Sequence, residues 1–269
     1  MKYSPQYSNL LQFDMLGKYA SLFHFSTTCN GGLSEGSYSS FNLGEYSGDI
    51  PENICKNRQH LAAILGISSD NLLLPCQTHE DKVLIVDSDF MSLPKILQNE
   101  QMKGVDAMIT NQKNVCIGVT TADCVPLLIF DPVKNVLATI HAGWRGTVAK
   151  IVTKTIEQMV KAYTCNPNDL KVGIAPAISQ NCFEVGDEVV TEFSDIGFLM
   201  DDISYRHPET GKIHIDLCRA NALLLTASGI LSTNIEFSGM CTYSNPELFF
   251  SARRQTIKSG RMVTGGILK

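Results

Sequence analysis

The sequence predicts an α+β fold in which mixed β-sheets are layered with helices in one compact domain spanning residues 1–269. Segments with helical spacing alternate with short apolar strands and a hairpin, without the regular strand–helix–strand rhythm of a doubly wound sheet. Apolar residues make up 44% of the 269 residues, which is ample for a large buried core. No linker rich in Pro, Gly or Ser divides the chain, so a single domain is the simplest organisation.

Three segments are expected to be helices. The first begins at Pro51, because proline suits the first turn, and it ends at Gly66. Residues 147–163 carry apolar side chains on one side and predict a continuous amphipathic helix. The third helix is expected to start at residue 215 and to reach Gly229.

The expected strands are short apolar runs at residues 72–75, 82–87, 115–120 and 171–178. Residues 126–141 contain two apolar runs joined by a turn at 131–135, which predicts a β-hairpin. Residues 26–48 are rich in Gly and Ser, and we expect an ordered surface loop that is either a passive connection or functional. The last part of the chain, from residue 235 to 269, is expected to mix short strands with loops.

Charge and cysteine usage indicate a cytoplasmic protein that binds neither nucleic acid nor membranes. The net charge is −5, and Lys and Arg are scattered apart from Arg253-Arg254, unlike the basic surface of a nucleic-acid-binding protein. The longest apolar stretch, residues 125–140, is interrupted by polar residues and proline and is too short to span a bilayer. The N-terminus lacks the apolar core of a signal peptide. The nine cysteines form no C-x-x-C pair and are expected to be reduced. No obligate protein partner is indicated.

His79, Cys124 and His141 each lie where a predicted strand ends, so their side chains are placed to share one cleft. Separations of 45 and 17 residues are too irregular for a zinc finger but suit a site assembled by folding. One thiolate and two imidazoles are good zinc ligands, and three protein ligands leave a fourth position open for catalysis. Taken singly, however, a strand cysteine is usually a buried apolar residue and a lone histidine a structural one.

The motifs around these residues resemble a known family. TTADCVPLLIFDP followed by ATIHAGWRG closely resembles the core signature of the bacterial YfiH-like proteins, the laccase-domain or polyphenol-oxidase-like family. The resemblance runs from about Ser26 to Met262. Further matching segments, in the family's order, are SFNLGEYSGDIPENICKNRQHLA, QTHEDKV, GVDAMIT, IAPAISQNCFEVGDEV and CTYSNPELFFSARRQTIKSGRM. Two positions depart from the usual pattern: Thr28 replaces an Arg, which puts a polar contact to substrate in doubt, and Ala175 replaces a Gly.

The resemblance implies a zinc-dependent purine nucleoside enzyme. In the family, the residues that correspond to His79, Cys124 and His141 bind zinc, and copper is an adventitious alternative. The family is described as cleaving adenosine, inosine, guanosine and methylthioadenosine with inorganic phosphate, giving the free base and ribose-1-phosphate. It is also described as deaminating adenosine to inosine. Zinc would lower the pKa of bound water to roughly 7 and so supply hydroxide at neutral pH.

Several residues are candidates for substrate binding, each with a structural alternative. Arg145 precedes a predicted helix and could face phosphate at its positive end, or it could pair with a carboxylate beside a tight glycine turn. Arg58 and the pair Arg253-Arg254 are further candidates, for which a structural role is the favoured alternative. Asn42 contacts substrate or hydrogen-bonds the loop backbone.

Two more residues near the motifs have alternative roles. Asp123, next to Cys124, could orient a zinc-binding histidine or cap a turn. Trp144, the only tryptophan, could form a wall against a purine ring or pack in the core.

Three other functions compete with the purine nucleoside hypothesis. Cys124 and His141 could form the nucleophile and base of a hydrolase or deamidase, as in a bacterial toxin deamidase whose fold the family is thought to resemble. His79 distinguishes the two readings, because a metal site needs it and a dyad does not. Hydrolytic editing of a peptidoglycan precursor, which some family members have been linked to, is a related alternative. Copper-dependent polyphenol oxidation would need many paired histidines, whereas this chain has six and no H-x-H motif.

Overall fold

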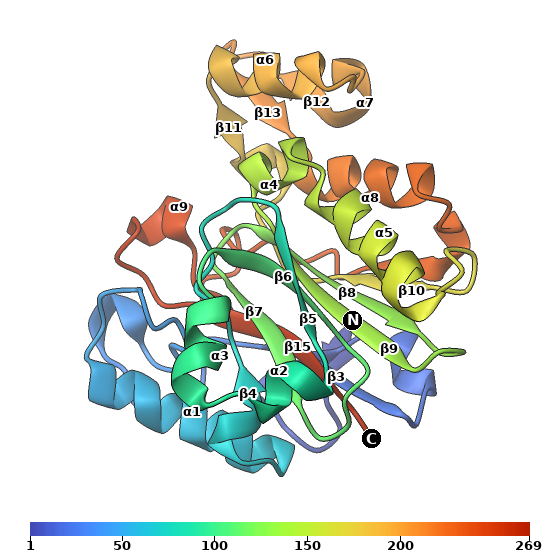
Figure 1. The fold of residues 1–269 in the computed structure, drawn as a ribbon. Coiled ribbons are helices and arrows are strands. Elements are labelled where there is room, and N and C mark those ends of the chain that lie inside the picture. Colours follow the sequence, from blue (N-terminus) through green and yellow to red (C-terminus); the bar gives the residue numbers. More distant parts are fainter.

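Two six-stranded sheets, a small third sheet and nine α-helices make up the computed structural model, which describes residues 1–269 (Figure 1). The first sheet has the strand order β1 (Lys2–Tyr3), β2 (Leu10–Gln12), β3 (Leu22–Thr27), β15 (Met262–Leu268), β7 (Cys116–Thr121) and β4 (Leu72–Leu73). The second has the order β14 (Ile235–Phe237), β10 (Lys171–Ile174), β8 (Val125–Asp131), β9 (Val136–Ala142), β6 (Val105–Thr110) and β5 (Lys82–Val86). The third has the order β11 (Glu184–Val185), β13 (Ile213–Ile215) and β12 (Ser204–Arg206).

The helices lie on the outer faces of the large sheets and around the third sheet (Figure 1). They are α1 (Pro51–Leu65), α2 (Ser88–Ser92), α3 (Lys95–Gln101), α4 (Trp144–Val148), α5 (Ile151–Tyr163), α6 (Asp187–Asp195), α7 (Met200–Ile203), α8 (Leu217–Ala227) and α9 (Ala252–Gln255). Parallel and antiparallel strand pairs occur in both large sheets. The predicted α+β class is therefore confirmed. No helix is both long and apolar enough to pass through a bilayer.

The hairpin predicted at residues 126–141 is formed by β8 and β9, which pair antiparallel from Val125↔Ala142 to Asp131↔Val136. Every residue of both strands is buried, because the hairpin lies between two layers. Leu127 and Ile140 pack with α5, whereas Leu128 and Leu137 pack on the first sheet. Burial on both faces explains why these strands read as continuous apolar runs.

The layers follow the order helix, sheet, sheet, helix. Helices α5 and α8 cover the outer face of the second sheet through apolar side chains such as Ile156 and Leu225. On the far side, Leu61 of α1 packs with Phe25 and Val263 of the first sheet. Helix α1 starts with Pro51 at its first position and ends at Gly66, whose φ of 69° allows the left-handed C-cap, as predicted.

One local prediction was wrong, and one was incomplete. The helix expected at 147–163 is broken at Lys150, which has a φ of 59°, so α4 and α5 are separate helices. Apolar periodicity does not reveal one left-handed residue, since the buried face resumes at Ile151. The C-terminal segment contains β15, a seven-residue strand paired with β3 and β7. Its Gly265 obscured the strand pattern, yet a Cβ there would lie 2.7 Å from the carbonyl oxygen of Ile117, so the close pairing requires glycine.

Candidate metal centre

His79, Cys124 and His141 come together at one end of the sheets. His79 lies in the loop between β4 and β5, Cys124 in the turn between β7 and β8, and His141 near the end of β9. Their possible ligand atoms all lie within 4.8 Å of one another, and this is the one group of three or more such residues in the chain. The two imidazole rings are 4.8 Å apart between centroids and nearly perpendicular, at 77°.

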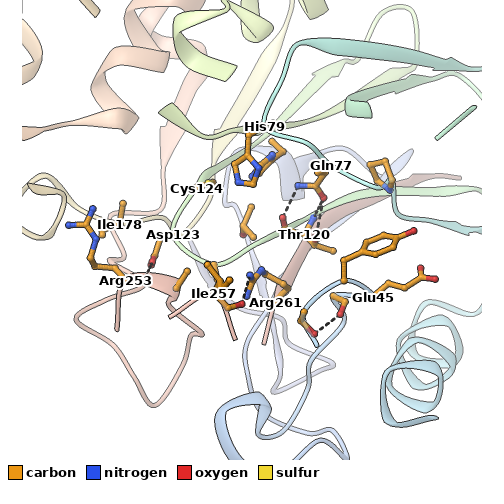
Figure 2. A pocket seen from close by; sticks show the side chains of 18 of the residues that line it. Glu45, Gln77, His79, Thr120, Asp123, Cys124, Ile178, Arg253, Ile257 and Arg261 are labelled. Atoms are coloured by element: carbon orange, nitrogen blue, oxygen red, sulfur yellow. Dashed lines mark hydrogen bonds between the residues drawn. The ribbon is translucent and has the colours of Figure 1, made fainter. Parts of the chain in front are cut away.

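Glycine and backbone geometry make room for this arrangement. A Cβ at Gly143 would lie 3.0 Å from Sγ of Cys124 and 3.2 Å from the ring of His79, so a larger residue would press on both. His79 itself has a φ of 64°, a left-handed conformation that non-glycine residues adopt at some cost. Gln77 fixes the same loop against β7, because its side chain accepts from the amide and hydroxyl of Thr120 and donates to the carbonyl (Figure 2).

Asp106 on β6 holds both histidines in position. It is fully buried, and its Oδ1 lies 2.7 Å from Nδ1 of His141. The same carboxylate accepts hydrogen bonds from the backbone N–H groups of Thr78, His79 and Glu80 at 3.0–3.1 Å. Asp106 therefore stabilises the strained turn of His79 and leaves Nε2 of His141 free to face Cys124.

The electrostatics of the centre favour a thiolate. Burial raises the pKa of Cys124, but the charge and hydrogen bonds of His141 and His79 outweigh burial and lower the pKa below the ordinary thiol value. Burial lowers the pKa of His141, but Cys124 and Asp106 outweigh it and raise the pKa above the ordinary imidazole value. The thiolate is the form of cysteine that binds metals, and it is also the nucleophilic form.

The three residues line a cavity of about 460 Å³, which is within the range of small-molecule sites. The loop at residues 44–47, the turn at 120–124 and the segment 252–261 supply most of its remaining walls. Figure 2 shows Glu45 at one edge, Asp123 and Arg253 toward the other, and His79 and Cys124 between them.

Among the predicted substrate-binding residues, Arg58 lines the cavity and Asn42 does not. Asn42 is fully buried, and its amide group donates to the hydroxyl of Ser47 and the carboxylate of Asp49. Its Oδ1 accepts from the backbone N–H groups of Gly44 and Arg261. Asn42 thus joins the loop at residues 44–47 to the segment at 252–261. This agrees with the alternative in which Asn42 hydrogen-bonds the loop backbone.

Arg145 and Arg254 also lie outside the cavity lining. The guanidinium of Arg145 stacks on the ring of Trp144, 4.3 Å from its centroid, and Trp144 packs against the main core. Arg254 donates to the carbonyl oxygens of Thr242, Tyr243 and Phe249, so its guanidinium is engaged by the backbone. Arg253, which was a candidate together with Arg254, lines the cavity, and so does Arg261, which was not among the predicted residues.

Asp123 acts within the turn and not on a histidine. Its carboxylate accepts from Thr242 Oγ1, Ser251 Oγ and the backbone N–H of Arg253 at 2.6–3.0 Å, which anchors the start of α9. Asp106 makes the histidine contact considered for Asp123, and the sequence offered only its presence in the GVDAMIT motif. Thr28, the departure from the family pattern, is buried and outside the cavity lining.

Fold and site together define an α+β protein with a two-histidine, one-cysteine centre, able to hold a metal ion, at a small-molecule cavity. Residues 23–269 match the family described as multi-copper polyphenol oxidoreductase laccase. The chain therefore belongs to this laccase-domain family of YfiH-like proteins, as its motifs predicted.

Individual relatives are similar over nearly the whole chain. A purine nucleoside phosphorylase from Bacteroides thetaiotaomicron is 43% identical over 256 residues, with 95% of each chain covered. The adenosine deaminase RL5 from an unknown prokaryotic organism is 42% identical, with 90% of this chain and 92% of that protein covered. The crystal structure of the Bacillus licheniformis hypothetical protein YfiH superposes with a TM-score of 0.88 at 30% identity, covering 97% of both chains.

Proposed function

We propose that this chain is a zinc-dependent purine nucleoside enzyme that cleaves nucleosides with phosphate and deaminates adenosine. The open His79–Cys124–His141 centre inside a nucleoside-sized cavity is the observation that carries the proposal. Relatives named purine nucleoside phosphorylase and adenosine deaminase, at 43% and 42% identity, support it. Adenosine, inosine, guanosine and methylthioadenosine are the proposed nucleosides, with inorganic phosphate as co-substrate.

The donor set fits zinc. A tetrahedral zinc ion with bonds of about 2.0–2.3 Å holds its ligand atoms roughly 3.3–3.8 Å apart, so atoms already within 4.8 Å need only small movements. The lowered pKa of Cys124 supplies the thiolate, and Asp106 directs the free nitrogen of His141 toward it. Copper binds such ligands more tightly and is proposed only as an adventitious occupant. A multicopper enzyme needs several sites, whereas this chain forms one such cluster.

The residues of the chain would divide the work as follows. A zinc ion held by His79, Cys124 and His141 would act as a Lewis acid and lower the pKa of water toward neutrality. Asp106 holds the His141 ring and the backbone turn of His79 in the positions that this role requires. In deamination, water attacks C6 of adenosine and ammonia leaves; in phosphorolysis, a phosphate oxygen attacks C1′ of the ribose and the base leaves.

One experiment tests the proposal directly. Zinc-loaded protein is incubated with adenosine in the presence and absence of phosphate, and adenine, inosine and hypoxanthine are separated by chromatography. We expect inosine in both samples and adenine only with phosphate. Retained zinc with no purine product would contradict the nucleoside assignment and point to another substrate, such as a peptidoglycan precursor.

The lowered pKa of Cys124 beside the raised pKa of His141 favours a second candidate, a Cys-His hydrolase or deamidase with Cys124 as nucleophile. Chelation and alkylation separate the two mechanisms. If activity survives complete removal of metal and is abolished by a thiol-alkylating reagent, the nucleophile mechanism is correct. If removal of metal abolishes activity and zinc restores it, the metal mechanism is correct.

We further propose that residues 1–269 act as one catalytic domain in the cytoplasm. The site draws on loops from both large sheets and on the C-terminal segment, which supports a single functional unit. All nine cysteines are unpaired, which supports a reducing compartment.

A further inference from the structure

The cavity contains three guanidinium groups, from Arg58, Arg253 and Arg261, and these differ in their ion pairing and in their place in the cavity. A phosphorolytic enzyme has to hold an oxyanion beside the ribose, and arginine suits this task because two parallel N–H donors match two oxyanion oxygens. The guanidinium best suited to an oxyanion is therefore one that forms no ion pair with a carboxylate, keeps at least two unused donors and lies inside the cavity instead of at its edge.

Arg58 and Arg253 are poor candidates. Nη1 of Arg58 forms an ion pair with Glu45 at 2.9 Å, and its Nε donates to the carbonyl of Leu43. The Glu45 carboxylate at that edge would also repel an incoming anion. Arg253 donates to the carbonyl of Glu184 and lies over the ring of Phe183, and Figure 2 shows it at the opposite edge, beyond Asp123.

Arg261 lies between these edges, below His79 and Cys124 in Figure 2. It takes part in none of the ion pairs of the structure. Burial lowers the pKa of its guanidinium, and the nearby Cys124 and Asp123 offset part of this effect. Its Nη1 donates to both oxygens of Ser259 and to the carbonyl of Gly260, and Nη2 donates to the carbonyl of Ile257. Nε–H and one N–H of Nη2 therefore remain without an acceptor.

The surrounding residues hold Arg261 rigidly. Its backbone N–H donates to Oδ1 of Asn42 at 2.9 Å, and the same oxygen fixes the amide of Gly44. A Cβ at Gly44 would lie 2.5 Å from Cγ and 2.8 Å from Cβ of Arg261, so glycine there lets the arginine stem pass beneath the loop. A half-buried, pre-positioned cation such as Arg261 binds an anion with little loss of side-chain freedom.

We propose that Arg261 binds the inorganic phosphate co-substrate through Nε and Nη2, an inference that rests on the proposed phosphorolysis. Phosphate held there lies across the cavity from the metal centre and away from the negative charge of Glu45. The reaction balances as follows: a phosphate oxygen bonds to ribose C1′, the bond from C1′ to the base breaks with its electrons going to the base, and the proton of hydrogenphosphate neutralises the base.

The ratio of the two products, adenine and inosine, measures the role of Arg261 in phosphate binding. With adenosine and phosphate present, the ratio of adenine to inosine formed by Arg261→Gln should fall at least ~10-fold, because a charge-assisted bidentate contact is lost for phosphate and not for water. Arg261→Lys keeps the positive charge but not the two parallel N–H donors, so it should give an intermediate ratio of adenine to inosine. Arg219→Gln, an exposed arginine on α8 outside the cavity, is the matched control and should leave the ratio unchanged. A folded Arg261→Gln protein with the wild-type ratio would overturn the proposal.

Direct binding separates this inference from the proposed function. Inorganic phosphate is titrated calorimetrically into zinc-loaded wild type, Arg261→Gln and Arg219→Gln at constant ionic strength, and adenosine 5′-monophosphate is titrated in parallel. Phosphate binding lost only in Arg261→Gln supports the inference, even if the wild type forms no free base and the proposed function fails. Equal phosphate binding by all three proteins overturns it, and so does a requirement for Arg261 with the nucleotide but not with free phosphate.

A second variant covers the case in which Arg261→Gln does not fold. Gly44→Ala leaves the guanidinium present but forces its stem to move, since the new methyl group overlaps Cβ and Cγ of Arg261. We expect Gly44→Ala to raise the KM for phosphate at least ~5-fold, with a smaller change in the KM for adenosine. The reason is that a displaced Arg261 guanidinium can no longer donate two hydrogen bonds to phosphate at once. Phosphate and adenosine KM values that rise equally would argue against a phosphate role.

Discussion

Replacing Asp106 with Asn should weaken zinc binding far more than its small change in shape suggests. Oδ1 of Asp106 accepts from the His79 amide and meets Nδ1 of His141, whereas Oδ2 accepts from the amides of Thr78 and Glu80. An Asn side chain has one oxygen, so its NH₂ group must face two donors in either orientation. If the NH₂ group faces His141, the ring has to move its proton to Nε2, the nitrogen that would bind zinc.

The magnitude follows from these contacts. Two donors left without acceptors cost about 1–3 kcal/mol each when they are buried. The hydrogen bonds from the backbone to Asp106 are only partly buried, so we expect the free energy of unfolding to fall by roughly 2–4 kcal/mol, the lower part of the summed range. Loss of the carboxylate that orients a metal-binding histidine costs about 10- to 100-fold in metal affinity. Zinc affinity is measured by competition with a chromophoric chelator, and stability by urea unfolding of the metal-free protein.

Asp131→Asn is the matched control for this experiment. Asp131 is also fully buried and accepts two backbone N–H groups, from Val133 and Lys134, but it lies at the far turn of the β8–β9 hairpin. This variant should leave zinc affinity within about twofold of wild type. Our reasoning is refuted if Asp106→Asn binds zinc as tightly as Asp131→Asn, because Asp106 would then hold only the backbone.

Three further predictions concern the metal centre and the core. Cys124→Ala should lose bound zinc and nucleoside turnover together while circular dichroism shows a retained fold; full activity in this variant would sink the ligand assignment. Gly143→Ala should lower zinc affinity at least ~10-fold with little change in the free energy of unfolding, because its methyl group would press on Sγ of Cys124 and on His79; unchanged affinity by chelator competition would show that the ligands can move freely. His24 is buried, and burial lowers its pKa to about 4, so the unfolded chain takes up a proton below about pH 6.5 that the folded chain resists. The free energy of unfolding should therefore fall by about 3 kcal/mol from this group between pH 6.5 and 4, and His24→Asn should flatten that slope in urea unfolding; an equally steep slope in the variant would show that other groups cause it.

The sequence predicted those parts of the fold whose signals are local. Both strands of the β8–β9 hairpin are apolar throughout because both faces are buried, and α1 carries its own start and stop residues. The sequence pattern gave no sign of the helix break at Lys150, because a single residue with positive φ changes the direction of the chain without changing which side chains are apolar. The third sheet was not anticipated at all, since its strands have only two or three residues each.

The site divides in a similar way. His79, Cys124 and His141 were found because each ends a strand in a recognisable motif, and their type restricts their chemistry. The role of Asp106 depends on β6 lying beside β9, which no spacing along the chain reveals. Arg253 and Arg254 show the same limit, because consecutive helical residues point about 100° apart. One therefore lines the cavity, and the other is engaged by three backbone carbonyls.

The position of β15 bears on how the protein is made. This strand lies between β3 and β7 in the first sheet, so the two halves of that sheet are joined by residues near the end of the chain. During synthesis, β3 has no neighbour on that side until more than two hundred further residues have emerged from the ribosome. Arg261 directly precedes β15, and its backbone reaches Asn42 only when the strand inserts. His79, Cys124 and His141 therefore leave the ribosome more than one hundred residues before Arg261, and the C-terminal segment is the last wall of the cavity to be made.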